Sequence, residues 1–146
     1  MEKESLIDKL TRKRILVIDD DPLVLKTIRE FLNDKYDVVV ARSGAVAYRY
    51  LESNPIDLVL LDYEMPGEKG TSVMQNIHKI NFSRAVPIIF LTGAADAQTV
   101  TQILSLKPQG YILKPVSQEK LLKKVRQVLF PGEEGNEWED WLSKNI

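Results

Sequence analysis

The chain has 146 residues, of which 44% are hydrophobic and 28% are charged, so it is long enough for one globular domain with a substantial core. Its formal net charge of −1 argues against an overall field that recruits nucleic acid or an anionic membrane. The absence of cysteine excludes disulfides, thiolate metal sites and thiol catalysis.

The first 13 residues stand apart from the pattern that follows. Leu6, Ile7 and Leu10 have helical spacing, which leaves two alternatives, a short extra helix or a frayed arm. The segment lacks the apolar core of a signal peptide, and no apolar run approaches the roughly 20 residues of a membrane span. We therefore expect a soluble, cytoplasmic protein without membrane contact.

Strand-like and helix-like patterns alternate from residue 14 to residue 130, which we interpret as one domain. The apolar runs are continuous, as is typical of parallel strands that are covered on both faces. The expected strands are 14–19, 37–41, 57–62, 87–92 and 110–113. The expected helices are 22–33, 43–53, 71–80, 97–106 and 117–130. This alternation predicts a right-handed, doubly wound α/β sandwich.

The expected helices begin at recognisable capping residues. Asp21 precedes Pro22 at the first helix, and Ser43 and Ser117 precede two later helices. Helical spacing predicts that the second helix buries Val46, either Tyr48 or Ala47, and Leu51. The apolar residues of the fourth helix are Val100, Ile103 and Leu104. His78, the only histidine, is expected at the surface of the third helix.

Polar side chains stand at the ends of four of the five expected strands. Asp19 and Asp20 follow the first strand, Asp62 ends the third, Thr92 ends the fourth and Lys114 follows the fifth. Because parallel strands of an open α/β sheet place their carboxyl ends at one edge, these groups are expected to converge there.

The converging groups suit phosphoryl chemistry. An ionised aspartate such as Asp62 can attack phosphorus if a cation neutralises the incoming charge. Asp19, Asp20 and Asp62 together suit Mg²⁺, and their crowding would raise the pKa of at least one of them. Lys114 can bind a phosphate oxygen, and before phosphate arrives it would pair with Asp62. The alternative is that such acids only cap a helix or start a turn, which we favour for Asp21.

Two neighbours of these groups add to the pattern. The Thr92 hydroxyl can donate to a phosphate oxygen, and Gly93 leaves room above the site for an incoming group. The Lys114-Pro115 peptide bond is a candidate for the cis form, which would aim the lysine inward.

Four motifs occur in the order typical of one family: LVIDDDP at 16–22, LVLLDYEMPG at 58–67, LTG at 91–93 and GYILKP at 110–115. On these motifs the sequence resembles the receiver domains of two-component response regulators over about residues 12–130. The resemblance implies a flavodoxin-like, five-stranded parallel sheet in the order 2-1-3-4-5, with helices on both faces.

The resemblance also implies roles for the acidic residues. Asp62 matches the phosphoacceptor of the family. Asp19 and Asp20 match the acids that, with Asp62 and the backbone carbonyl of Glu64, bind Mg²⁺. The cofactor expected from the resemblance is therefore Mg²⁺.

The remaining matches concern phosphate binding and switching. Thr92, Gly93 and Lys114 match the phosphate-binding residues, and Lys114 acts with Asp62 in the phosphoryl transfer. Tyr111 matches the aromatic residue that moves inward as Thr92 shifts toward phosphate. The alternative for Tyr111 is an ordinary half-buried aromatic on an edge strand.

The resemblance implies that the protein accepts a phosphoryl group from a histidine kinase or phosphotransfer protein. It also implies that the protein is not an enzyme, apart from assisting its own phosphorylation and dephosphorylation. Its partners would include a downstream effector or an output domain outside this chain, without direct nucleic-acid contact. A homodimer through the fourth helix, fifth strand and fifth helix is a further expectation.

Two residues depart from the family pattern. Glu64 adds a fourth carboxylate near the site, and Ala94 cannot orient an attacking water by a side-chain hydrogen bond. We hypothesise that Glu64 and Ala94 set the lifetime of the phosphoryl group.

Residues 131–146 form an acidic segment that contains Trp138, Trp141 and Leu142 at helical spacing. It either docks on the basic last helix, which carries Lys120 and Lys123, or stays loose; it could also begin a linker.

Other functions fit the sequence less well. A phosphatase of the haloacid dehalogenase type would need a second aspartate where Glu64 stands. A phosphate-independent interaction module with a receiver-like fold remains an alternative. Nucleotide binders would need a glycine-rich loop after a strand, which the sequence lacks.

Overall fold

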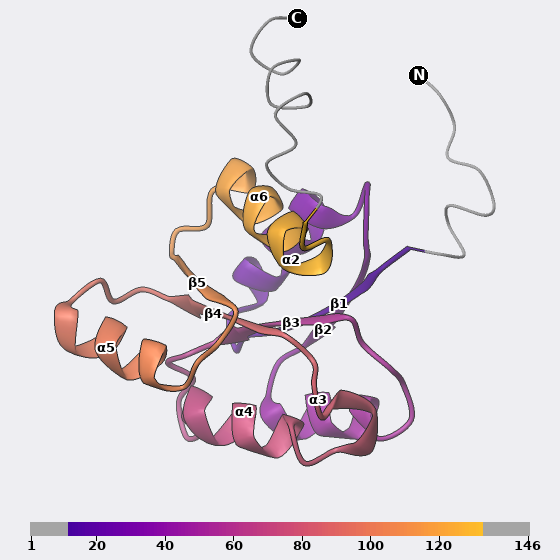
Figure 1. Cartoon of the computed structure of the whole chain (residues 1–146), viewed down its shortest axis with the longest axis horizontal. Helices are drawn as coiled ribbons and strands as arrows, with labels where there is room; N and C mark the ends of the chain where they lie inside the picture. Colours follow the sequence, from indigo (N-terminus) through magenta and orange to yellow (C-terminus); the bar gives the residue numbers. More distant parts are fainter. Residues whose placement is uncertain (1–11, 133–146) are drawn as a thin grey trace, which may run out of the picture.

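The computed structural model describes residues 12–132 as a parallel five-stranded sheet in the order β2-β1-β3-β4-β5 (Figure 1). The strands are β1 (Arg14–Ile18), β2 (Asp37–Ala41), β3 (Leu58–Asp62), β4 (Ile88–Thr92) and β5 (Gly110–Leu113). The helices, labelled as in Figure 1, are α2 (Pro22–Leu32), α3 (Gly44–Leu51), α4 (Gly70–Ile77), α5 (Ala97–Ser105) and α6 (Gln118–Leu129). The expected strand order is therefore confirmed.

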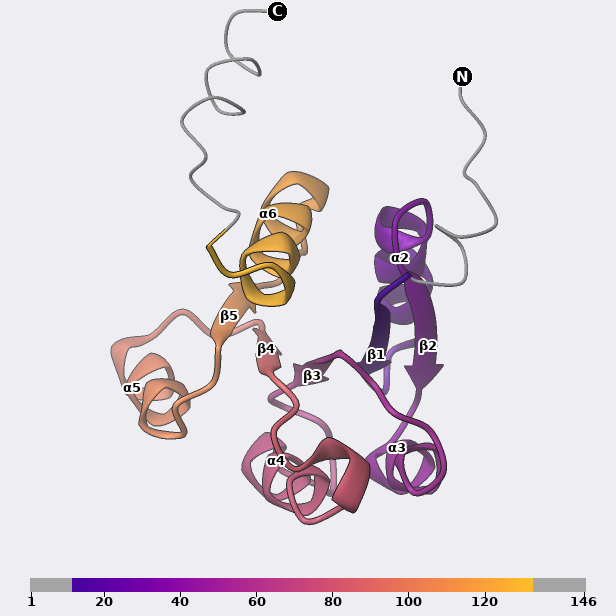
Figure 2. The same cartoon turned by 45° about the vertical axis from the view of Figure 1, so that its right-hand side comes forward.

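Helices cover both faces of the sheet. Figure 2 shows α2 and α6 on one face and α3, α4 and α5 on the other. All residues of β3 and β4 are buried, which explains their continuous apolar runs. Side chains alternate between two cores, so that Leu60 and Leu91 face α2 and α6 while Leu61 and Phe90 face the other three helices.

The strand register brings the expected site residues to one edge. Ile18 pairs with Leu61, so Asp19 and Asp62 continue two neighbouring strands at the same level. Thr92 pairs with Leu113, which places Lys114 one residue beyond the end of β5.

The helix starts follow the expected capping. The Asp21 carboxylate accepts a hydrogen bond from the Leu23 N–H at 2.9 Å, and Pro22 opens α2. Ser43 and Ser117 cap α3 and α6 in the same way. Each such cap contributes about 1 kcal/mol.

The third expected helix ends earlier than its periodicity predicts. Helix α4 stops at Ile77, and a separate 3₁₀ turn, Asn81–Ser83, follows it. The buried Ser83 hydroxyl donates to the Ile77 carbonyl at 2.6 Å, which satisfies an acceptor that a continuing helix would have used. Strands β2 and β5 have the expected bounds, and the bounds of the other elements differ from expectation by two residues at most.

Three side chains lie outside their expected places. Val46 and Leu104 were expected in the core but are 46% and 55% exposed, whereas their neighbours Ala47 and Ile103, also among the expected positions, are fully buried. His78 was expected at the surface but is half-buried, and its Nε2 lies 3.1 Å from the Val86 carbonyl oxygen.

The expectations for the first 13 residues and for the acidic segment fall almost wholly on residues 1–11 and 133–146, outside the described residues. Among residues 12–132, no helix combines the length and apolar character that crossing a membrane requires.

Candidate functional site

Three carboxylates meet at the carboxyl edge of the sheet. Asp19 is fully buried, Asp62 is 4% exposed and Asp20 is exposed. One oxygen from each lies within 4.8 Å of the others. This proximity follows from the pairing of β1 with β3, because Asp19 follows the first and Asp62 ends the second.

The two oxygens of Asp19 have different surroundings. Oδ1 accepts a hydrogen bond from the backbone N–H of Asp21 at 2.9 Å. Oδ2 lies 2.8 Å from Nζ of Lys114, close enough for an ion pair but without hydrogen-bond geometry. A fully buried carboxylate oxygen that no described residue hydrogen-bonds has electron pairs available for a cation.

Lys114 joins the two buried aspartates. Its Nζ also lies 3.3 Å from Oδ1 of Asp62, so the expected pairing with Asp62 is present and is shared with Asp19. Burial lowers the pKa of Lys114, but the contacts with the two aspartates outweigh it and raise the pKa overall. The Lys114-Pro115 peptide bond is cis, and the Lys114 N–H donates to the Thr92 carbonyl at 2.8 Å.

The pKa of Asp62 is raised to about 6. Burial is the main cause, and the charge of Asp19 adds to it. The Glu64 N–H, which donates to Oδ1 of Asp62 at 3.1 Å, and the Lys114 ammonium oppose the shift. The sequence predicted a raised pKa from crowding, whereas burial is the larger effect.

Thr92 contacts a carboxylate that sequence reasoning did not connect to it. Thr92 is fully buried, and its Oγ1 donates to Oε1 of Glu64 at 2.8 Å. The Ala94 N–H donates to the same Oγ1 at 3.1 Å. The sequence singled out Glu64 as a fourth carboxylate, but no sequence signal gives the rotamer that directs it to Thr92.

Gly93 and Tyr111 complete the set of expected residues. A Cβ atom built on Gly93 would meet only Oε2 of Glu64, at 3.9 Å, so the space above this residue is open, as expected. Tyr111 is half-buried on β5 and packs against the core beneath α3, α4 and α5.

The loop after Asp62 is held by contacts that sequence reasoning missed. The Tyr48 hydroxyl of α3 donates to the Glu68 carboxylate and accepts a bond from Nδ2 of Asn76 at 3.1 Å. Burial and the contact with Glu68 raise the pKa of Tyr48 to about 12, and the hydrogen bond from Asn76 opposes this shift. In the same loop, the Tyr63 hydroxyl lies 3.3 Å from Oε1 of Gln102 in α5. These contacts tie the loop to three helices.

Comparison with known proteins agrees with this geometry. The chain matches the model of the response regulator receiver domain over residues 15–126. It is 35% identical over 119 residues to a probable cyclic di-GMP phosphodiesterase of Vibrio cholerae, covering 82% of this chain and 27% of that protein. It is 30% identical over 116 residues to the response regulator RR06 of Streptococcus pneumoniae, covering 79% of this chain and 52% of that protein. The chain thus spans about half the length of these relatives or less.

A solved structure with the same fold is the receiver domain of the sensor histidine kinase PA1611 of Pseudomonas aeruginosa, which has a magnesium ion coordinated in its active site cleft. It aligns with this chain at a TM-score of 0.73 and 27% identity, and the alignment covers 82% of this chain and 98% of the chain of that structure. The family match spans most of the described domain, so the resemblance seen in the motifs is confirmed. The chain belongs to the response regulator receiver domain family of two-component systems.

Proposed function

We propose that this chain is a phosphorylation-dependent switch that accepts a phosphoryl group on Asp62 from the phosphohistidine of a histidine kinase or phosphotransfer protein. The observation that carries the proposal is the triad of Asp19, Asp62 and Lys114, with Nζ of Lys114 within 3.3 Å of both carboxylates. Thr92 stands at the end of the next strand with its hydroxyl at the same edge.

The residues fit a magnesium ion. Asp19, Asp20, Asp62 and the backbone carbonyl of Glu64 would hold it, and Oδ2 of Asp19 offers a buried oxygen that no described residue hydrogen-bonds. When bound, the ion would supply positive charge against the negative charge of the phosphoryl group. A related receiver domain carries magnesium in its cleft, which supports the assignment.

In the proposed transfer, a carboxylate oxygen of Asp62 attacks phosphorus while the bond between phosphorus and the histidine nitrogen breaks. With a pKa of about 6, Asp62 is mostly ionised at pH 7 and therefore competent as the nucleophile. Lys114 already touches Oδ1 of Asp62 and would remain beside the phosphoryl oxygens. Gly93 would leave room for the transferred group.

The switch would begin with the hydroxyl of Thr92. This hydroxyl donates to Glu64, so it must leave that carboxylate before it can donate to a phosphoryl oxygen. Tyr111 would then take up the space that Thr92 vacates. The phosphoryl charge would thus bias a two-state element at the end of the sheet.

Glu64 would compete with the phosphoryl group for Thr92. Its carboxylate also repels an incoming phosphate, so Glu64→Ala should speed phosphorylation of Asp62 several-fold. We propose that Glu64 and Ala94 together set the lifetime of the phosphoryl group. The test compares the rate of phosphoryl loss in Glu64→Asn and Ala94→Glu with the rate in the parent. Unchanged decay rates in both variants would exclude this role.

Beyond assisting its own phosphorylation and dephosphorylation, we propose no catalysis for this chain. Its proposed site of action is the cytoplasm, and its output partner would be an effector protein or a separate domain. The proposed dimer face is made of α5, β5 and α6, and direct nucleic-acid binding is not part of the proposal.

The decisive experiment is intact-mass measurement after incubation with a small-molecule phosphodonor and Mg²⁺. We expect one phosphoryl adduct in the parent, and none in Asp62→Asn or without Mg²⁺. If no adduct forms, incubation with phosphorylated histidine kinases would test whether the donor must be a protein. Failure of both would favour the phosphate-independent interaction module.

A further inference from the structure

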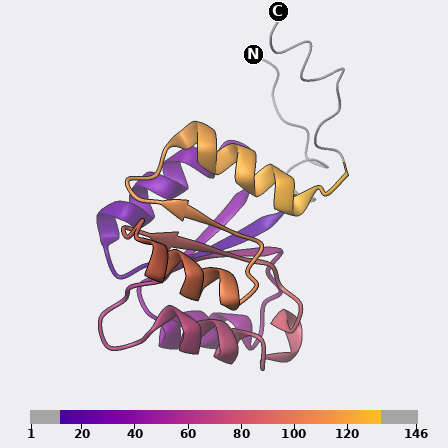
Figure 3. The same ribbon diagram turned by 60° about the vertical axis from the view of Figure 1, so that its left-hand side comes forward.

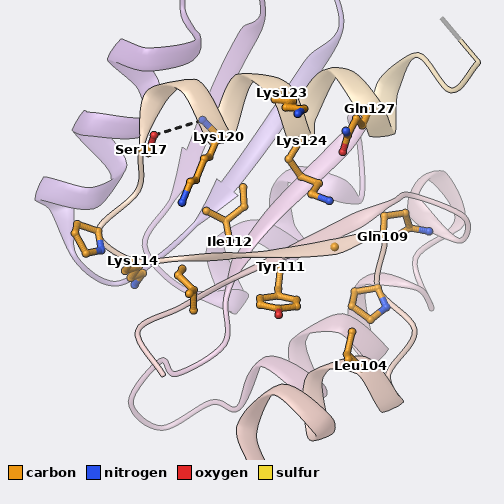
Figure 4. Close-up of a pocket in the computed structure, with 14 residues that line it drawn as sticks. Leu104, Gln109, Tyr111, Ile112, Lys114, Ser117, Lys120, Lys123, Lys124 and Gln127 are labelled. Carbon is orange, nitrogen blue, oxygen red and sulfur yellow. Dashed lines mark hydrogen bonds between the residues drawn. The ribbon is translucent and has the colours of Figure 1, made fainter. Parts of the chain in front are cut away.

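A groove runs along the exposed side of β5, between α5 and α6. Figure 3 shows β5, an edge strand of the sheet, between α5 and α6. The groove has a volume of about 860 Å³ and is open to solvent, and Figure 4 shows the residues that line it. In Figure 4, Lys120 and Lys124 extend from α6 toward β5, and Tyr111 lies on the other side of the strand near Leu104. The groove therefore has a basic wall and an apolar wall.

The basic wall has no described partner. Lys120, Lys123 and Lys124 all line the groove, and no acidic side chain among residues 12–132 lies within ion-pair distance of them. Lys124 lays its aliphatic stem against Gly110, where an added Cβ would come within 3.1 Å of the lysine Cδ. The three ammonium groups are thus gathered on one side of the groove and available to a partner.

The apolar wall is exposed to a degree that is unusual for large aliphatic side chains. Leu104 is 55% exposed and Leu113 is 44% exposed, although their chain neighbours Ile103 and Ile112 are buried. Tyr111 of β5 is half-buried and also lines the groove. A ligand for this groove would combine negative charge with large apolar groups.

We propose that the groove is the docking site for residues 133–142 of the same chain. This segment contains five acidic side chains and no basic one, and it carries both tryptophans of the chain. Trp138 and Trp141 would contact the apolar wall, and the acidic side chains would face the lysines. At three residues apart, the two indoles would share one face if the segment forms a helical turn on docking.

The segment can reach the groove. Only Phe130, Pro131 and Gly132 separate it from the end of α6, and the positive φ of Gly132, +89°, is a conformation that glycine favours. Ten extended residues span up to about 33 Å, whereas the 12 residues of α6 span about 18 Å. The segment could therefore turn back along the full length of α6.

In the docked state, residues 133–142 would cover the face of α5, β5 and α6 through which we propose dimerisation. The segment would then compete with a second copy of the chain or with another protein for the same surface. This inference does not depend on phosphorylation of Asp62, so the two proposals can fail separately.

Tryptophan fluorescence tests the docking directly, because Trp138 and Trp141 are the only tryptophans in the chain. In the monomeric full chain we expect emission shifted to the blue of free indole in water and reduced quenching by acrylamide. Reversing the basic wall with Lys120→Glu, Lys123→Glu and Lys124→Glu should move the emission to the red and raise the quenching constant at least twofold.

Two further variants keep the test specific. A control triple variant makes the same change of charge at three exposed lysines outside the groove, with Lys26→Glu, Lys69→Glu and Lys79→Glu. It should leave the fluorescence unchanged. Adding Glu134→Lys, Glu137→Lys and Glu139→Lys to the groove triple variant should restore the blue emission, because the complementary charges are exchanged. Leu104→Ser, at an exposed position, should weaken docking without a change of charge.

Several results would overturn the proposal. Parent emission and quenching equal to those of free indole would show that the segment does not dock. Equal effects of the two lysine triple variants would show that the groove is not the site. Blue emission that is lost when a dimer dissociates on dilution would identify a second copy as the occupant. Circular dichroism would confirm that each variant is folded.

Discussion

Lysines occur in two regions of this molecule under opposite conditions. Lys114 lies between the buried carboxylates of Asp19 and Asp62, with its charge paired on both sides. Lys120 and Lys123, on the α6 side of the groove, are exposed and have no acidic partner among the described residues. In the first region burial makes the partner obligatory, whereas in the second water solvates the charge and leaves it free for a ligand.

The largest expected effect comes from removing the cation that lies between the two buried aspartates. Lys114→Met leaves two buried carboxylates without a positive partner, which should lower the free energy of unfolding by about 3–5 kcal/mol without Mg²⁺. The loss should be smaller at pH 5, where Asp62, with a pKa of about 6, is mostly protonated. Urea denaturation at both pH values measures the effect. Lys120→Met is the matched control and should change stability by about 0.5 kcal/mol or less.

The second effect concerns the acid in the same site. Because the pKa of Asp62 is about 6 in the fold and 3.8 ordinarily, the folded protein binds this proton more tightly. The contribution of Asp62 therefore favours folding below about pH 4 and is lost as the pH rises through about 6. Asp62→Asn should be more stable than the parent at pH 7 by up to about 3 kcal/mol without Mg²⁺.

Urea unfolding of Asp62→Asn and the parent at several pH values from 3.5 to 7 would show this difference growing with pH. A constant difference across the range would mean that the folded pKa of Asp62 is not raised.

An intermediate effect is expected at the tie that supports the loop after Asp62. Tyr48→Phe removes a hydroxyl that bonds to the Glu68 carboxylate and to Asn76, which should cost about 1–2 kcal/mol. Tyr63→Phe, whose hydroxyl makes one longer contact at 3.3 Å to an exposed glutamine, should cost less. Thermal denaturation of both variants compares them, and equal costs would contradict the greater importance assigned to the Tyr48 contacts.

The smallest effect is expected at an exposed ion pair. Nε of Arg14 lies 3.2 Å from Oδ2 of Asp37, but the two side chains are 40% and 56% exposed. Asp37→Asn should therefore change the free energy of unfolding by less than about 1 kcal/mol, and by still less in 0.5 M salt. A salt-insensitive loss as large as that of Lys114→Met would remove the contrast between buried and exposed pairs.

Much of the fold could be predicted from local patterns. Continuous apolar runs predicted all five strands, and Asp21, Ser43 and Ser117 predicted three helix starts, because capping depends on near neighbours in the chain. The inward placement of Val46 and Leu104 was wrong, because two adjacent residues on a helix can each face a sheet and the packing chooses between them.

The sequence by itself determined which groups stand at the carboxyl edge, since strand ends are local features and parallel pairing collects them on one side. Only the tertiary structure decided that Lys114 touches Asp19 as well as Asp62, that Thr92 bonds to Glu64, and that exposed Leu104 lines a groove with the lysines of α6. These contacts join residues far apart in the chain, and their geometry depends on rotamers and packing that no local pattern specifies.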